Sequence, residues 1–537
     1  MERVLTWWKR EKRYMVLLKA CLVALLPLVC CLVHCAMDGM SIGQAYLPGA
    51  PWNDELFYFK QVEAMVEYGY PRGYYGFNES HALKLSYAAW SPVLVFPWII
   101  WGKLFGWTYF SPFVCNIVLL SLACFLFVWL VKPTWKQVGV LSFLFALFPL
   151  FVRYMLSGMP EIICMSMLII FYGVCINYLE RERGYKLAVM LVLAGLLVLM
   201  RPYMLLFLLL PMGLWIRRSG RRGVIGSGLV LAAVLGLYWA IKHFLGAEYF
   251  APLFFTDWIT TFFTEGLVSG IRNFFGTLYY MGKDFLAFTI QGFKTGWTAG
   301  AFFGGYLLLM GIFIGQSLRN WRRKEQKQLI INGHLAISFV GMLFALLLMY
   351  KLIEGSKHLL TFMAVGIFLV SLMDTRFYRK MVLVGAVFAY LYTYQAVDPY
   401  DYQVPYVTEQ QEEQLAYWQE ILEEKLVLDE AKVPSFDNVV IWDFQSKPVA
   451  DEKQQPVVDD KTPQTGGYVN LKWQLLYALP TGTGISCCRP DYVREQLEHM
   501  ESRYIATLSG GETDVRCREL GYEELARDED MVVYRRY

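Results

Sequence analysis

The chain has 537 residues, of which 56% are hydrophobic and 18% are charged, whereas roughly a quarter of the residues are charged in an average soluble domain. This composition excludes an ordinary soluble enzyme, a collagenous or disordered chain and a disulfide scaffold. The 49 basic and 46 acidic residues leave a net charge of only +3, so no charge excess indicates nucleic-acid binding. A polytopic membrane protein fits best.

Apolar segments recur along the chain, and about 20 such residues suffice to cross a bilayer, with fewer in incomplete crossings. We predict eleven spans, at 14–36, 110–131, 137–155, 161–178, 187–200, 202–216, 224–245, 299–317, 328–350, 357–373 and 380–396. The first span follows basic residues as a signal peptide does, but no A-x-A cleavage site follows it, so we expect it to be retained.

The distribution of Lys and Arg tests this assignment, because these residues collect in short cytoplasmic loops. With the N-terminus inside, the cytoplasmic segments hold 22 of them and the short outer turns hold four. A crossing by the apolar segment 89–106 would invert this bias, so we expect that segment to be re-entrant or interfacial. The C-terminus is then outside.

The outer side receives two long loops, 37–109 and 246–298, and the tail 397–537. We predict a transmembrane domain over 1–396 and an extracytoplasmic α/β domain over 397–537, because β-type runs alternate with helical stretches in the tail. Loop 246–298 is rich in Phe, Tyr and Trp and is expected to lie along the membrane surface. The tail contains Cys487, Cys488 and Cys517, which could include one disulfide in an oxidising compartment. No Cys or His spacing indicates a metal site.

Ionisable residues near membrane depth usually line polar cavities or act on a substrate. Those on the outer side are Asp54, Glu55, Arg153, Glu161, Arg201, Lys351, Glu354, Lys357 and His358. If the helices form a bundle, we expect these groups to converge in an outer cavity that could hold a phosphate and a general base.

Structural roles compete with these functional ones. Asp54 and Glu55 could stabilise the first turn of a helix that opens with Asn53 as its N-cap. Glu161 could likewise stabilise a helix start, and Arg201 could snorkel to the headgroups. Lys351, Lys357 and His358 could be interfacial anchors. Spacing alone leaves these alternatives open.

Several short motifs, taken in order, resemble the GT-C superfamily of membrane glycosyltransferases. The chain is similar to the members of the protein O-mannosyltransferase and lipid A aminoarabinose transferase type. The motifs are Trp52-Asn53-Asp54-Glu55, Tyr70-Pro71-Arg72-Gly73-Tyr74-Tyr75, Trp90-Ser91-Pro92-Val93, Ser157 to Glu161, Leu193 to Pro202, and Ser356-Lys357-His358-Leu359-Leu360. Together they cover about residues 10–396.

The resemblance implies an inverting transfer of a sugar from a polyprenyl-phosphate carrier to an extracytoplasmic acceptor in the cell envelope. It implies that Asp54 is the general base, with Glu55 beside it, and that Glu161 orients a substrate. The donor phosphate would be bound by Arg201, Lys351, Lys357 and His358, and the cavity would be lined by Arg72, Tyr74 and Trp90. No metal or other cofactor is required by this mechanism.

Two departures from the family pattern leave the donor sugar undefined. Lys357-His358 stands where Arg-Tyr is commoner, and Ser91-Pro92 stands where His-Pro-Pro is frequent. A lipid or glycan transporter with the same outer charges is the main alternative, and a non-catalytic relative is another. The predicted location is a bacterial plasma membrane, with membrane lipids as partners.

Overall fold

The computed structural model describes residues 2–50, 52–70, 72, 75–79, 92–146, 148, 150–245, 255–295, 298–351, 356–373, 380, 383, 404–429, 435–446, 469–488 and 490–537. The chain packs into two compact units. Unit 1 contains residues 1–44, 113–238 and 253–404, and unit 2 contains residues 45–112, 239–252 and 405–537. Residues 45–112, from the predicted loop 37–109, thus pack with residues 405–537.

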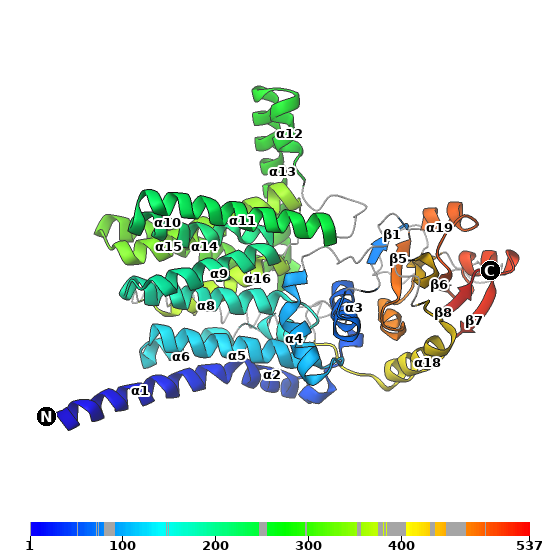
Figure 1. Cartoon of the computed structure of the whole chain (residues 1–537), viewed down its shortest axis with the longest axis horizontal. Coiled ribbons are helices and arrows are strands. Elements are labelled where there is room, and N and C mark those ends of the chain that lie inside the picture. The colour runs from blue at the N-terminus through cyan, green and yellow to red at the C-terminus, as the bar shows by residue number, and fades with distance from the viewer. Residues whose placement is uncertain are drawn as a thin grey trace. The chain divides into compact units, whose positions relative to one another are not determined.

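Unit 1 is a bundle of apolar helices, several of which run in the same direction or its reverse (Figure 1). Its helices are α1 (Glu2–Ala24), α2 (Leu26–Met37), α5 (Ser111–Val131), α6 (Trp135–Ala146), α7 (Leu150–Met155), α8 (Glu161–Glu180), α9 (Gly184–Met200), α10 (Leu205–Ser219), α11 (Arg221–Leu245), α14 (Thr298–Arg323), α15 (Gln326–Phe344) and α16 (Ser356–Ser371). These helices cover the first ten predicted spans. The eleventh, 380–396, lies almost wholly outside the described residues.

Six helices in the described part of the chain are long and apolar enough to cross a membrane. They occupy Arg13–Met37, Ser111–Val131, Glu161–Glu180, Arg221–Leu245, Phe302–Arg323 and Gln326–Tyr350. Two further apolar helices are shorter, at Gly184–Met200 and Lys357–Ser371. The predicted span 137–155 is divided between α6 and α7. The fold is therefore mainly helical and membrane-spanning, and the count of eleven stays a prediction.

The second long loop forms two helices of unit 1, α12 (Asp257–Thr264) and α13 (Leu267–Thr295), which stand across the direction of the neighbouring helices (Figure 1). Apolar side chains recur at helical spacing along α13 and are exposed to solvent; they include Val268, Ile271, Phe275 and Tyr279. An exposed apolar stripe is typical of a helix at the lipid interface. The location of this loop along the membrane surface remains a prediction.

Unit 2 is built on a six-stranded sheet with the strand order β1-β5-β2-β6-β8-β7. The strands are β1 (Tyr75–Phe77), β2 (Val439–Asp443), β5 (Gly484–Cys488), β6 (Tyr504–Leu508), β7 (Glu523–Arg527) and β8 (Met531–Arg535). The first four strands in this order, β1, β5, β2 and β6, pair in parallel. Strand β8 pairs antiparallel with both β6 and β7. A two-stranded sheet, β3 (Gln445–Ser446) with β4 (Val469–Asn470), lies apart from it.

The helices of unit 2 are α3 (Asn53–Tyr68), α4 (Phe96–Phe105), α18 (Glu409–Lys425), α19 (Pro490–Gln496) and α20 (Glu512–Glu519), with a 3-10 segment, η7 (Trp473–Ala478). The predicted α/β character of the tail is confirmed by β2, β5, β6 and β8. Helix α4 contains ten residues and is therefore about 15 Å long, which agrees with the expectation that segment 89–106 does not cross the membrane.

Residues 75–79, which belong to the predicted loop 37–109, are integrated into this sheet. Tyr75 pairs with Ile485 of β5. The Glu79 carboxylate accepts hydrogen bonds from the backbone N–H of Ser502 at 2.8 Å, from the hydroxyl of Ser502 and from the hydroxyl of Tyr492 at 3.3 Å. The loop is therefore a structural part of unit 2.

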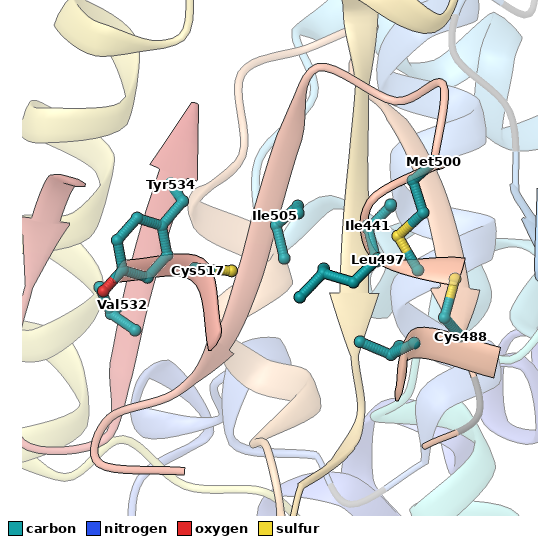
Figure 2. Packing of buried hydrophobic residues seen from close by; sticks show 9 residues of the cluster. Ile441, Cys488, Leu497, Met500, Ile505, Cys517, Val532 and Tyr534 are labelled. Carbon is teal, nitrogen blue, oxygen red and sulfur yellow. The ribbon is translucent and has the colours of Figure 1, made fainter. Parts of the chain in front are cut away.

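The hydrophobic core on one side of the sheet joins strands to α19 and α20. It comprises Ile441, Cys488, Val493, Leu497, Met500, Ile505, Cys517, Val532 and Tyr534 (Figure 2). None of the three cysteines of the tail forms a disulfide in the described part of the chain. Burial raises the pKa of Cys488 and of Cys517 to about 12, so both thiols remain protonated and behave as small apolar groups.

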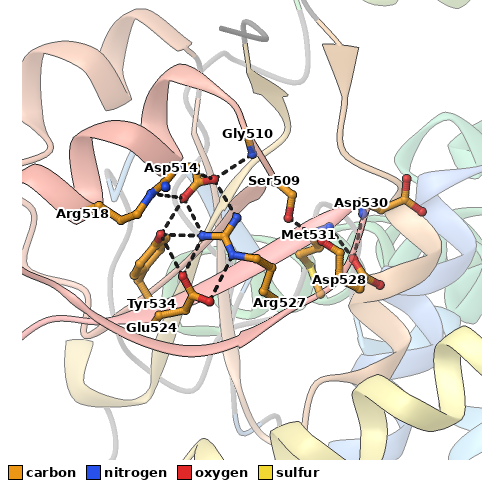
Figure 3. A network of polar contacts seen from close by, with 10 residues as sticks. All are labelled: Ser509, Gly510, Asp514, Arg518, Glu524, Arg527, Asp528, Asp530, Met531 and Tyr534. Carbon is orange, nitrogen blue, oxygen red and sulfur yellow. Dashed lines mark hydrogen bonds and ion pairs between the residues drawn. The ribbon is translucent and has the colours of Figure 1, made fainter.

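A polar network ties α20 to β7 and β8 (Figure 3). Its centre is Asp514, whose side chain is fully buried and accepts hydrogen bonds from both terminal nitrogens of Arg527, at 2.8 and 2.9 Å, and from the Tyr534 hydroxyl at 2.5 Å. Burial alone would raise the pKa of Asp514, but these bonds outweigh it and hold the pKa at about 2. The carboxylate is therefore charged under physiological conditions.

Candidate functional site

The site in unit 1 begins with the antiparallel packing of α8 and α9. A three-residue connection joins the two helices, so the start of α8 lies beside the end of α9. Helix α9 ends at Met200 because Arg201 precedes Pro202 and adopts an extended conformation. Glu161 is the first residue of α8, and the hairpin brings it level with Arg201.

Glu161 and Arg201 form a buried ion pair. Arg201 Nη2 donates to Glu161 Oε1, and each side chain is only 1% exposed. The helix dipoles favour a negative charge at the start of α8 and a positive charge at the end of α9. Because two charges are costly to bury in an apolar bundle, this pair marks a candidate site. Stabilisation of the first turn of α8 explains why a carboxylate stands at Glu161. It does not explain why that carboxylate is buried or why it is paired with Arg201.

Aromatic and imidazole groups surround the pair. The Tyr203 hydroxyl lies 3.4 Å from Nδ1 of His358, and the rings of Tyr350 and His358 are 4.8 Å apart. Arg201 is within electrostatic range of all three groups. Tyr350 ends a π-helical turn, Ala345–Tyr350, and such turns are frequent at functional sites.

The turn before α8 is fixed by Asn116 of α5. Its side-chain amide donates to the backbone carbonyl of Ser157 at 3.1 Å and lies 3.4 Å from that of Met155. The Ser157 hydroxyl accepts from the backbone N–H of Met159, so Ser157 stabilises the turn rather than capping α8, whose N-cap is Pro160. Arg153, also predicted to face the cavity, is fully buried and donates to the Leu156 carbonyl.

The predicted phosphate-binding residues fall into two groups. Arg201 and His358 lie in the buried cluster. Lys351 instead forms an ion pair with Asp257, with 2.8 Å between Nζ and Oδ2, and its ammonium lies over the Phe255 ring. Lys357 precedes His358 at the start of α16 and is half-buried. A phosphate would have to compete with Asp257 for Lys351.

Asp54 and Glu55 belong to unit 2, in the first turn of α3 as predicted. The residue before the helix is Trp52, and no side chain caps the start of α3, so Asn53 is not the N-cap. Glu55 is fully buried, whereas Asp54 is partly exposed. A general base must reach a substrate hydroxyl, so Asp54 is better suited to that role than Glu55.

The predicted cavity-lining residues are only partly described. Arg72 is buried in unit 2, where its guanidinium lies 4.4 Å from the centre of the Tyr68 ring. Tyr74 and Trp90 lie outside the described residues, as does Glu354. The part of the chain that the structure describes contains no group of three His, Cys, Asp or Glu residues that could hold a metal ion.

Sequence reasoning did not select Tyr203, Tyr350 or Asn116. Tyr203 follows the Arg201-Pro202 break directly, so its position beside a conspicuous polar interruption was an available signal. Asn116 in the apolar segment 110–131 was another, because an amide within a membrane helix requires partners. Tyr350 gave no comparable signal.

Comparisons with known proteins give one structural likeness. No protein-family model matches the chain, and no curated protein matches it. The chain is similar to the oligosaccharyltransferase of Archaeoglobus fulgidus, solved in complex with Zn and sulfate. The identity is 14%, the match covers 97% of this chain and 73% of that chain, and the TM-score is 0.48.

Proposed function

We propose that this chain is a membrane glycosyltransferase of the GT-C type that moves a sugar from a polyprenyl-phosphate donor to an extracytoplasmic acceptor. The observation that carries the proposal is the buried Glu161–Arg201 pair with His358 and Tyr203 beside it. A carboxylate, a guanidinium and an imidazole lie together at one end of the bundle of unit 1, and the sequence motifs of the resemblance include all three.

In the proposed reaction, Asp54 accepts the proton of the acceptor hydroxyl as the acceptor oxygen attacks the anomeric carbon. The bond between that carbon and the donor phosphate breaks with inversion, and polyprenyl phosphate leaves with one additional negative charge. Arg201 and His358 offset this charge, and a guanidinium is well suited to two phosphate oxygens at once. Glu161 holds the Arg201 guanidinium in position. The proposed reaction requires no metal or cofactor.

The test is sugar transfer by the purified full-length protein in proteoliposomes. The donors are polyprenyl phosphates that carry radiolabelled mannose, glucose or aminoarabinose, and the acceptors are envelope lipids and glycans. We expect transfer with one donor by the wild type and a loss of at least about 100-fold for Asp54→Asn, in line with general-base catalysis. Glu67→Gln removes an exposed carboxylate from the same helix, α3, and is expected to leave transfer unchanged.

Two results would contradict the proposal in different ways. Full transfer by Asp54→Asn would remove Asp54 as the base. Failure of the wild type with every donor, together with movement of a labelled lipid between leaflets, would favour the transporter instead.

A further inference from the structure

A second polar site lies at the other end of the bundle in unit 1. A cavity of about 340 Å³ is lined by residues of α8, α14, α15 and α16, and this volume lies in the range of small-molecule sites, roughly 300–1,000 Å³. Its residue on α8 is Ile176, fifteen positions after Glu161, which corresponds to roughly 22 Å along the helix. The cavity is therefore separate from the candidate catalytic cluster.

Four polar residues of α14 lie on one face of the helix and line the cavity. Gln316, Arg319, Asn320 and Arg323 have the spacing i, i+3, i+4 and i+7, which places them in one stripe. The preceding residues on the buried side of this helix, Leu309, Ile312 and Phe313, are apolar. Polar residues in a candidate membrane span are costly and usually functional.

Two of these residues are left without acceptors. Gln316 and Asn320 are each 4% exposed, and within the described part of the chain neither side-chain amide nitrogen has a hydrogen-bond partner. A buried donor without an acceptor destabilises the fold. Their position in the wall of a cavity is explained by a ligand that supplies acceptor oxygens.

The electrostatic environment shows which acceptor fits. Among the described residues of the lining, Arg319 and Arg323 outnumber the carboxylate of Glu325. Helix α15 begins at Gln326 with no side chain capping it, and Glu325 and Gln328 from this start also line the cavity. A helix start attracts anions through its N–H groups and its dipole. Water could satisfy the amides, but it would not use the positive charge.

We propose that this cavity binds a phosphate group through Arg319, Arg323 and the amides of Gln316 and Asn320. The lining also contains the apolar side chains of Ile331, Leu369 and Leu372, so a hydrocarbon can lie beside the phosphate. The chemistry fits the phosphate headgroup of an anionic lipid, and a free phosphate satisfies the same donors.

The experiment measures ligand binding to the full-length protein in phosphate-free dodecyl maltoside by native mass spectrometry. The probes are dioleoylphosphatidic acid, dioleoylglycerol, which has the same chains without the phosphate, and inorganic phosphate. We expect phosphatidic acid to bind at least about tenfold more tightly than dioleoylglycerol, and Arg319→Gln to lose about tenfold, as for one charge-assisted contact. Arg322→Gln is the matched control, because Arg322 carries the same charge in the same turn but is not part of the lining.

The double variant Q316L/N320L separates binding from folding. It removes the two buried donors, so we expect it to lose the ligand while its unfolding temperature without ligand stays equal or rises. If it does not fold, Asn320→Asp, which is isosteric and repels phosphate, replaces it. Competition by inorganic phosphate identifies the free anion as sufficient, and binding of phosphatidic acid alone identifies the lipid. The proposal is overturned if neither phosphatidic acid nor inorganic phosphate binds. It is also overturned if Arg322→Gln loses as much affinity as Arg319→Gln.

Discussion

Breaking the Glu161–Arg201 pair should destabilise unit 1 more than removing both of its members. Both side chains are 1% exposed, so Arg201→Met leaves a carboxylate buried in an apolar bundle. Removing one partner of such a pair costs about 3–5 kcal/mol, whereas replacing both partners is often nearly neutral. We therefore expect each of Arg201→Met and Glu161→Gln to lower the free energy of unfolding by about 3–5 kcal/mol, and the double variant to recover most of that loss.

The assay is a double-mutant cycle measured by reversible unfolding of the full-length protein in mixed SDS micelles. The control is Arg217→Gln, whose partner Glu182 lies 3.5 Å away and half-exposed, so its loss should cost less than about 1 kcal/mol. If the effects of the two single changes simply add in the double variant, the residues are not coupled. The buried pair would then not exist in the folded protein.

Three further changes test the packing. The pKa of Asp514 is lowered from 3.8 to about 2, so its charged form contributes about 2 kcal/mol to the free energy of unfolding. This contribution is present above pH 4 and is lost as the pH falls through 2. The unfolding temperature of Asp514→Asn should therefore depend less on pH between 4 and 2 than that of the wild type. Gly226→Ala places a methyl group 2.3 Å from the Trp215 ring, whereas Gly228 has open space around it. Gly226→Ala should therefore lower the free energy of unfolding by about 1–3 kcal/mol, and Gly228→Ala should be tolerated. Equal unfolding temperatures of the two variants would contradict this packing. Glu79→Gln weakens the bonds that anchor residues 75–79, so limited proteolysis should cleave this loop faster, and an unchanged rate would show that the anchor is dispensable.

The sequence was sufficient for the six long apolar helices, because the length of an apolar run indicates whether it can cross a bilayer. Helices α12 and α13 were not predicted as helices, since they lie in the segment expected to be the loop 246–298. The tail was also predictable, since β2, β5, β6 and β8 coincide with apolar β-type runs. Strand β7 (Glu523–Arg527) was not predicted, because it is charged and only partly buried, so it lacks the apolar pattern.

The site was predictable to the extent that ionisable residues in apolar surroundings are conspicuous. Glu161, Arg201 and His358 were selected for this reason, and the structure places them in one cluster. Their pairing was not predicted, because it depends on the register of the α8 and α9 hairpin. The ion pair between Lys351 and Asp257 was missed as well, since 94 residues separate the two in the chain.

Strand β1 has a consequence for biosynthesis. Its partner β5 is made about 400 residues later, which at a translation speed of 5–20 residues per second is a delay of roughly 20 to 80 s. During that interval residues 75–77 have no strand to pair with, while the helices of unit 1 are already emerging from the ribosome. A nascent chain stalled before Gly484 should therefore leave its first loop open to proteases until synthesis resumes.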